Sequence, residues 1–123
     1  MFKVVFYEDK NGKSEIYEQM MDLANKSNTN KDCRIQLKQI TLYVDLLKQI
    51  GMRLPKKITK HIRDEIWELR PGNNRIMFFC HIENTFVLPH MFKKQTQKTP
   101  NREIEKAFNE MNDYIARHGG FKK

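Results

Sequence analysis

The hydrophobic pattern predicts a strand and then an amphipathic helix at the start of the chain. Residues 2–8 are rich in aromatic and β-branched side chains, and the turn-forming residues 9–12 end this segment. Ser14 is suited to cap a helix that extends to about Lys26. The residues that recur at helical spacing on its apolar face are Ile16, Met20 and Leu23.

A longer helix is predicted over residues 31–50. The polar residues 27–30 separate it from the first helix, and Gly51 follows it at the position of a C-terminal cap. Its apolar face is formed by Leu37, Ile40, Val44 and Leu47. Because these apolar stripes must be buried, we expect the two helices to form a hairpin that packs into the core.

Three strands are predicted in succession after a basic, irregular segment at residues 52–60. The predicted strands are residues 62–69, 75–81 and 85–92. Short turns at residues 71–74 and 82–84 join them, and turns of this length favour antiparallel hairpins.

A final helix is predicted from Pro100 to about His118. We expect Thr99 to be its N-cap, with Pro100 at the first helical position, where a missing N–H costs nothing. Gly119 follows the helix and is suited to end it. The apolar face of this helix is formed by Ile104, Phe108, Met111 and Ile115.

This order of elements, β-α-α-β-β-β-α, predicts an α+β fold. We expect a mainly antiparallel sheet with two N-terminal helices and one C-terminal helix packed against one of its faces. A chain of 123 residues is long enough for one hydrophobic core, so we expect a single domain over residues 1–123.

The net charge of +8 comes mainly from the second half of the chain. Residues 1–52 carry 8 basic and 7 acidic side chains, whereas residues 53–123 carry 15 basic and 8 acidic ones. A basic face attracts nucleic acids, because binding releases their condensed counterions. A solvated, lysine-rich surface explains the same charge equally well, so charge by itself does not decide between the two.

The composition predicts a cytoplasmic protein that does not bind membranes. The mean hydropathy is −0.75, and no apolar run approaches the roughly 20 residues that cross a bilayer. Residues 1–6 lack the features of a signal peptide. Cys33 and Cys80 do not have metal-ligand spacing, and we expect both to be buried, reduced thiols.

Two arginines flank the predicted turn at residues 71–74. Strand alternation places Trp67 in the core and sends Glu68 and Arg70 to the other face. Arg75 directly follows the turn, so we expect it near Arg70 across the hairpin. Two arginines in that arrangement can hold one phosphate by bidentate hydrogen bonds, while a plain surface cation is an equally good interpretation of Arg70.

A second group of cations, Lys93, Lys94 and Lys98, lies between the last strand and the last helix. Lysines beside a helix N-terminus are suited to bind a phosphate, and the alternative is a loop that only increases solubility. Along an extended strand, Lys94 shares a face with His90, and Lys93 points the opposite way. A hydrogen-bonded core histidine is favoured over a catalytic one for His90, since its strand is apolar.

No metal-binding or nucleotide-binding motif is present, so we expect neither a metal nor a cofactor. Cleavage of RNA by its own 2′-hydroxyl needs only ordinary side chains, because cations can stabilise the charge that develops on the phosphorane oxygens. The arginines and lysines of this chain are therefore the catalytic candidates.

Six short motifs follow one another along nearly the whole chain. They are Phe-Tyr-x-Asp-x-x-Gly (6–12), Trp-Glu-Leu-Arg-Pro (67–71), Asn-Arg-Ile (74–76), His-x-Phe-x-Lys (90–94), Thr-Gln-Lys-Thr-Pro (96–100) and Arg-Glu-Ile-Glu-x-Ala (102–107). Together they resemble the phage-derived, HigB-like branch of the RelE toxin superfamily. The sequence departs from the family pattern at Met91, where glycine is usual, and at Gln95, where a second lysine is usual.

The resemblance implies a small RelE-like fold and an endoribonuclease toxin that cleaves mRNA, commonly on the ribosome. Arg70, Arg75 and Lys94 occupy the family's basic positions and are the implied catalytic residues. The further RNA-binding candidates are Lys60, His90, Lys93 and Lys98. The resemblance also implies a HigA-like antitoxin with a helix-turn-helix domain, through which the complex contacts operator DNA.

Two other functions stay open at the level of sequence. The same basic face would serve a non-catalytic nucleic-acid-binding module. A degenerate toxin that only binds its antitoxin and acts as a co-repressor is the other alternative. A neighbouring reading frame for a short helix-turn-helix protein would favour both toxin interpretations over the binding module.

Overall fold

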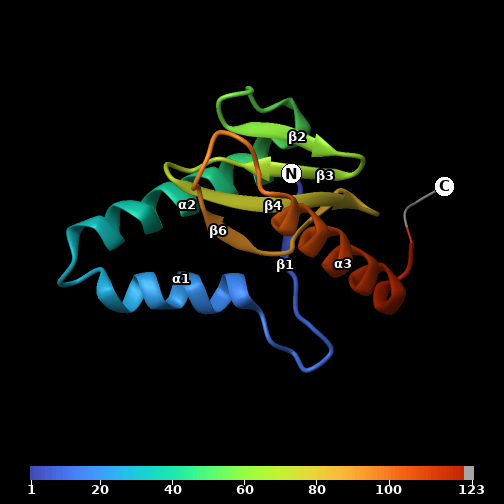
Figure 1. Ribbon diagram of the computed structural model, residues 1–123, viewed down its shortest axis with the longest axis horizontal. Coiled ribbons are helices and arrows are strands. Elements are labelled where there is room, and N and C mark those ends of the chain that lie inside the picture. The colour runs from blue at the N-terminus through green and yellow to red at the C-terminus, as the bar shows by residue number, and fades with distance from the viewer. Residues whose placement is uncertain (121–123) are drawn as a thin grey trace.

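The computed structural model describes residues 1–120, so residues 121–123 of the predicted domain lie outside the described part (Figure 1). The described chain folds into three α-helices, one short 3-10 helix and a six-stranded sheet. The elements are β1 (Lys3–Phe6), α1 (Glu15–Lys26), α2 (Lys31–Ile50), η1 (Gly51–Arg53), β2 (Thr59–Arg63), β3 (Ile66–Leu69), β4 (Asn74–His81), β5 (Thr85–Leu88), β6 (Met91–Lys93) and α3 (Asn101–His118).

Local capping signals determine where the two N-terminal helices begin and end. The Ser14 hydroxyl accepts a hydrogen bond from the backbone N–H of Tyr17, as predicted for the start of α1. Gly51 ends α2 with a positive φ of 69°, and a Cβ there would lie 2.5 Å from the ring of Phe2. Both the backbone conformation and the packing therefore require glycine at this position.

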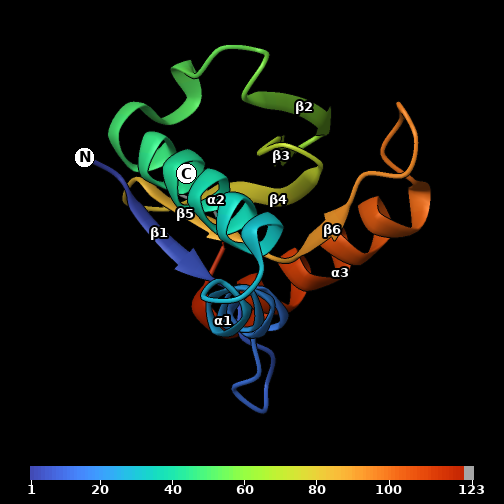
Figure 2. The same cartoon turned by 90° about the vertical axis from the view of Figure 1, so that its left-hand side faces the viewer.

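The sheet is mixed, with strand order β1-β5-β4-β3-β2 and with β6 paired to β4. Strand β1 runs parallel to β5, and the remaining pairs are antiparallel. The predicted α+β fold with a mainly antiparallel sheet is thus confirmed. The parallel pair places the first strand of the chain at the edge of the sheet beside a strand from its second half (Figure 2).

Two of the predicted strands are wrong as single elements. Residues 62–69 belong to a β2–β3 hairpin that turns at Asp64, where φ is +49°. Residues 85–92 form β5 and β6, which are separated by Pro89 and His90. Proline cannot donate a hydrogen bond to the sheet, so the ladder is interrupted there, and β5 and β6 pair with opposite ends of β4.

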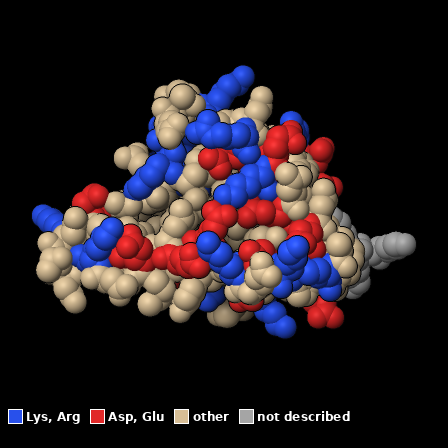
Figure 3. All heavy atoms as spheres, turned by 60° about the horizontal axis from the view of Figure 1, so that its bottom comes forward, with Lys and Arg blue, Asp and Glu red and all other residues tan. Residues whose placement is uncertain are grey.

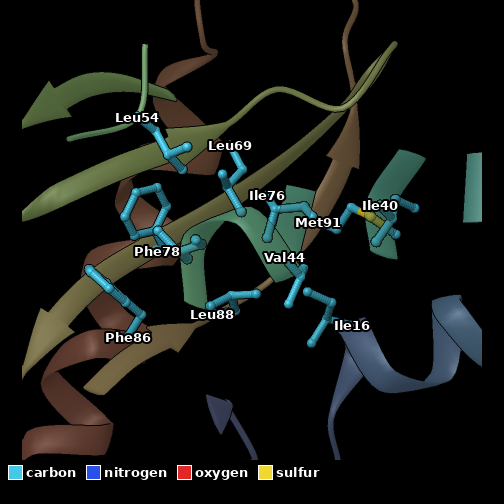
Figure 4. Packing of buried hydrophobic residues seen from close by; sticks show 11 residues of the cluster. Ile16, Ile40, Val44, Leu54, Leu69, Ile76, Phe78, Phe86, Leu88 and Met91 are labelled. Atoms are coloured by element: carbon cyan, nitrogen blue, oxygen red, sulfur yellow. The ribbon is translucent and has the colours of Figure 1, made fainter. Parts of the chain in front are cut away.

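The helices cover both faces of the sheet, so the prediction that they share one face is wrong (Figure 2). Helices α1 and α2 pack on the face that includes Ile76 and Phe78 of β4; Figure 4 shows the side chains of this cluster, to which the helices contribute Ile16, Ile40 and Val44. Helix α3 packs on the opposite face. That face is formed by Ile66, Met77, Phe79 and Val87, against Ala107, Met111 and Tyr114 of the helix. Strand β4 carries apolar residues on both sides, as expected for a central strand that is covered on both faces along most of its length.

The cysteines are less buried than predicted. Cys80 is exposed and Cys33 is half-buried, and both are free thiols. Cys80 is the exposed position in the otherwise buried strand β4, so the expectation that both are buried is wrong. Within residues 1–120, none of the helices has the length and apolar character needed to cross a membrane.

Candidate functional site

A buried carboxylate lies at the centre of the predicted cationic site. Glu68 of β3 is only 2% exposed, and its Oε1 lies 3.7 Å from Arg70 Nε and 3.8 Å from Arg75 Nε. The turn after Arg70 reverses the chain, so the expected proximity of the two arginines across the hairpin is confirmed. We call Glu68, Arg70 and Arg75 the arginine cluster.

Arg75 is a fixed, buried part of this cluster. Its guanidinium donates hydrogen bonds of 2.8 Å to the carbonyl oxygens of Gly72 and Asn74, and its side chain is 9% exposed. Burial lowers the pKa of Arg75, the neighbouring Arg70 lowers it further, and Glu68 opposes both effects. Arg75 is buried because Met77 and Phe79 follow it on the face of β4 that α3 covers.

Arg70 is more accessible, with 26% of its side chain exposed. Its Nε is buried, and it has no hydrogen-bond partner within residues 1–120. A buried donor without an acceptor costs free energy. Arg70 can therefore still bind an anionic group. Arg75 is less able to do so, because its guanidinium already donates to backbone carbonyl oxygens.

The loop from Lys94 to Pro100 completes the site, although not through the predicted helix cap. Thr99 Oγ1 donates a 2.7 Å hydrogen bond to Glu68 Oε2 instead of capping α3. Helix α3 begins at Asn101, and Pro100 before it makes no side-chain cap. The predicted role of Thr99 as N-cap is therefore wrong, because its hydroxyl donates to the buried carboxylate of Glu68, which needs a hydrogen-bond partner.

The predicted lysines separate onto different sides of β6. Lys94 and Lys98 line a small hollow together with Glu68 and Arg75. Lys93 instead donates to the side-chain oxygen of Gln36 on α2. The expected alternation of Lys93 and Lys94 is thus observed, and only the latter joins the arginine cluster. Lys60 is exposed on β2, directly opposite Glu68 in the strand register.

His90 lies outside the exposed part of this site. It is 1% exposed, with Nδ1 at 2.5 Å from Glu110 Oε1 and Nε2 at 3.0 Å from Glu103 Oε1. Both ring nitrogens therefore face carboxylates of α3, and neither is left to contact RNA in this arrangement. The interpretation as a hydrogen-bonded core histidine agrees with this geometry.

Sequence reasoning missed three carboxylates, namely Glu68 beside the two arginines and Glu103 and Glu110 beside His90. Glu68 was not singled out, because strand alternation alone places it on the face opposite Trp67, which we expected to be exposed to solvent. Glu103 and Glu110 lie on the predicted α3 two turns apart, and only the packing of α3 shows that they meet His90. One signal was available for Glu68, since it is a lone charge inside the apolar stretch from Ile66 to Leu69.

The arginine cluster with Lys94 and Lys98 carries four cations and one carboxylate, so it has a net positive charge suited to a phosphate. This positive charge is local. On the face shown in Figure 3, lysines and arginines lie among acidic side chains and form no continuous basic surface. Among residues 1–120, no three His, Cys, Asp or Glu side chains are grouped so that they could hold a metal ion.

The chain matches one protein family, and it is similar to solved structures at low sequence identity. The family described as phage derived protein Gp49-like (DUF891) matches residues 31–112, a segment that contains the arginine cluster. Among solved structures, the chain is similar to one described as the YoeB-YefM complex from Staphylococcus aureus. The identity is 11%, the TM-score is 0.48, and the match covers 78% of this chain and 99% of the other. No curated protein matches the sequence.

Proposed function

This chain belongs to the phage-derived Gp49-like family, and from that premise we propose that it is the toxin of a toxin–antitoxin system. Its proposed activity is endoribonucleolytic cleavage of mRNA, on the ribosome and in the cytoplasm. The motif resemblance to the HigB-like branch of the RelE superfamily supports this proposal. The proposed partner is a HigA-like helix-turn-helix antitoxin, through which the complex would contact operator DNA.

The observation that carries the proposal is the arginine cluster beside Lys94. Glu68 accepts from Thr99 and lies within 4 Å of both arginines, so one carboxylate fixes the positions of two guanidinium groups. Preorganised cations stabilise a charged transition state because they need no reorganisation when the charge develops. A merely solubilising surface would not need a buried carboxylate to hold its arginines.

The proposed reaction is a transesterification within the RNA. The 2′-oxygen attacks the adjacent phosphorus and loses its proton, and the bond between phosphorus and the 5′-oxygen breaks. The leaving 5′-oxygen takes up a proton, and the other product carries a 2′,3′-cyclic phosphate. Arg70 and Lys94 would contact the phosphorane oxygens, and Arg75 would hold the cluster and add its charge.

Controlled expression tests the proposal. Induction of the chain alone should arrest growth, and co-expression of the helix-turn-helix protein from the neighbouring gene should relieve the arrest. Purified ribosome–mRNA complexes should yield fragments that end in a 2′,3′-cyclic phosphate. Fragments ending in a 3′-hydroxyl would contradict the mechanism. Intact RNA bound by a folded protein would favour the non-catalytic module.

A further inference from the structure

A groove of about 580 Å³ lies along β2, the edge strand of the sheet. In Figure 1 this strand forms the upper margin of the sheet, below the connection that leads into it from α2. Its volume falls within the range of small-molecule sites. Arg70, which also belongs to the arginine cluster, lines this groove.

Two aromatic rings line this groove. His61 of β2 is the register partner of Trp67 of β3, and their ring centroids are 4.9 Å apart. Trp67 is partly buried against the core, which fixes its position. His61 is exposed, and its Nε2 donates a 2.7 Å hydrogen bond to the carbonyl oxygen of Asp64, which orients the ring. Flat rings held in place are the platform on which unstacked nucleobases bind.

The charged side chains that line this groove favour a polyanionic ligand. The ionisable side chains that line it are Lys56, Lys60, His61 and Arg70, and none of them is acidic. A second groove, of about 460 Å³, lies beside α1 and is lined by Glu15, Glu18 and Asp22. With three carboxylates against the single cation Lys93, that groove disfavours phosphates, whereas the one along β2 attracts them.

Arg70 connects the two parts of the surface. It belongs to the arginine cluster through Glu68 and also lines the β2 groove. Its buried Nε has no acceptor within the described chain. A nucleotide with its phosphate on the exposed part of the Arg70 side chain would have its base within reach of Trp67 and His61.

We propose that the β2 groove binds one base of a single-stranded RNA, next to the phosphate held by the arginine cluster. The base stacks on the exposed ring of His61, which Trp67 supports at a tilt of 54°, and Lys56 and Lys60 contact the neighbouring phosphates. This inference deepens the proposed function by naming a base-binding subsite for the same RNA. Binding does not require cleavage, so the two proposals fail separately.

Trp67 is the single tryptophan of the chain and reports on this groove directly. The test uses the full chain and 2′-O-methyl RNA heptamers, which lack the attacking hydroxyl and cannot be cleaved by the proposed route. We expect saturable quenching of Trp67 fluorescence by base-bearing heptamers. Heptamers of equal charge in which all bases are absent should bind more weakly and quench little.

Variants at His61 separate stacking from charge. His61→Ala should weaken the base-bearing heptamer about 10-fold, since base stacking on an aromatic ring is of that size, and His61→Phe should restore binding. Lys31→Ala removes an exposed cation at the distant start of α2 and should leave the affinity within about twofold once salt is matched. Equal quenching by abasic and base-bearing RNA would overturn the proposal, as would an unchanged affinity of His61→Ala.

Cleavage assays keep the two proposals distinguishable. Saturable, base-dependent quenching by a protein that leaves RNA uncut would retain the subsite and reject the endoribonuclease. Efficient cleavage without base-dependent quenching would retain the enzyme and reject the subsite. Quenching of Trp67 fluorescence by acrylamide measures how accessible the groove is. If a co-purified antitoxin reduces this quenching and RNA does not, a protein segment occupies the groove and the RNA proposal is wrong.

Discussion

Arg70 and Arg75 flank one turn but differ in burial, so their substitutions should have different consequences. Arg70 has 26% of its side chain exposed, and Arg70→Ala should cost less than about 1 kcal/mol of stability while lowering cleavage about 100-fold. Arg75→Ala leaves Glu68 buried with one cation fewer and should cost about 3 kcal/mol. Urea unfolding and single-turnover cleavage measure the two effects.

Arg75→Lys is the matched control, because it keeps the charge and loses the guanidinium that donates to the carbonyl oxygens of Gly72 and Asn74. It should unfold at a urea concentration between those of the wild type and Arg75→Ala. A folded Arg70→Ala protein with wild-type cleavage would remove Arg70 from the proposed site.

The lysines are distinguished by the partner that each one meets. Lys94 lines the hollow with Arg75, whereas Lys93 donates to Gln36. Lys94→Ala should therefore reduce single-turnover cleavage by roughly 10-fold or more, and the defect should persist at low salt, because a contact to the transition state is not replaced by long-range attraction. The losses in Lys93→Ala and Lys98→Ala should be smaller and should disappear at low salt.

Measurements at two salt concentrations decide the assignment of the lysine. If Lys93→Ala reduces cleavage more than Lys94→Ala does, the catalytic contact lies on the Lys93 side of β6 and the assignment to Lys94 is wrong.

At the scale of elements, the position of α3 depends on polar contacts as well as on its apolar face. His90 joins the β5–β6 connection to Glu103 and Glu110 of the helix. His90→Ala leaves these two carboxylates near each other without a donor, so we expect a loss of about 2–4 kcal/mol in the free energy of unfolding. Adding Glu110→Gln to His90→Ala should recover part of this loss, because it removes one carboxylate charge.

Chemical denaturation of both variants checks this interpretation. A His90→Ala protein with wild-type stability and reduced RNA affinity would instead place His90 in the RNA-binding site.

The other end of α3 is fixed to the N-terminal part of the chain by Tyr7, and this contact predicts a pH dependence. Tyr7 donates a 2.6 Å hydrogen bond to Asp113, and burial together with this carboxylate raises the pKa of Tyr7 to about 12. The fold thus favours the neutral phenol. Its contribution is complete below the unfolded pKa of about 10 and is lost as the pH rises toward 12.

Wild type and Tyr7→Phe should therefore converge in stability as the pH approaches about 12. The part of the wild-type stability that disappears over this window is about 2 kcal/mol, and Tyr7→Phe should lack it. Urea unfolding of both proteins between pH 9 and about pH 12 tests this. Parallel pH profiles for the two proteins would mean that Tyr7 does not titrate with a raised pKa.

At the scale of the whole molecule, the sheet brings separate segments of the second half of the chain to one cationic site. Residues from β3, β4 and the loop before α3 form it, while α1 and α2 cover the opposite face and hold the sheet in place. Because four side-chain cations supply the positive charge, cleavage should persist within about twofold in EDTA when ribosome integrity is checked separately. Loss of activity in EDTA that added Mg²⁺ restores on intact ribosomes would contradict this prediction.

The sequence by itself determined the features that depend on neighbouring residues. The helix periodicities, the caps at Ser14 and Gly51, and the turn that brings Arg75 back toward Arg70 were all predicted correctly, because their energetics are set within a few residues. The strand register also separated Lys93 from Lys94, since side-chain direction alternates along any extended segment.

Only the tertiary structure decided the contacts between residues far apart in sequence. Thr99 could cap a helix or bind a carboxylate, and the burial of Glu68, 31 residues earlier, decided for the carboxylate. The face chosen by α3 and the parallel pairing of β1 with β5 likewise depend on how apolar surfaces on both sides of the sheet are shared. Such choices are made by packing and desolvation of the whole chain, which a local pattern does not contain.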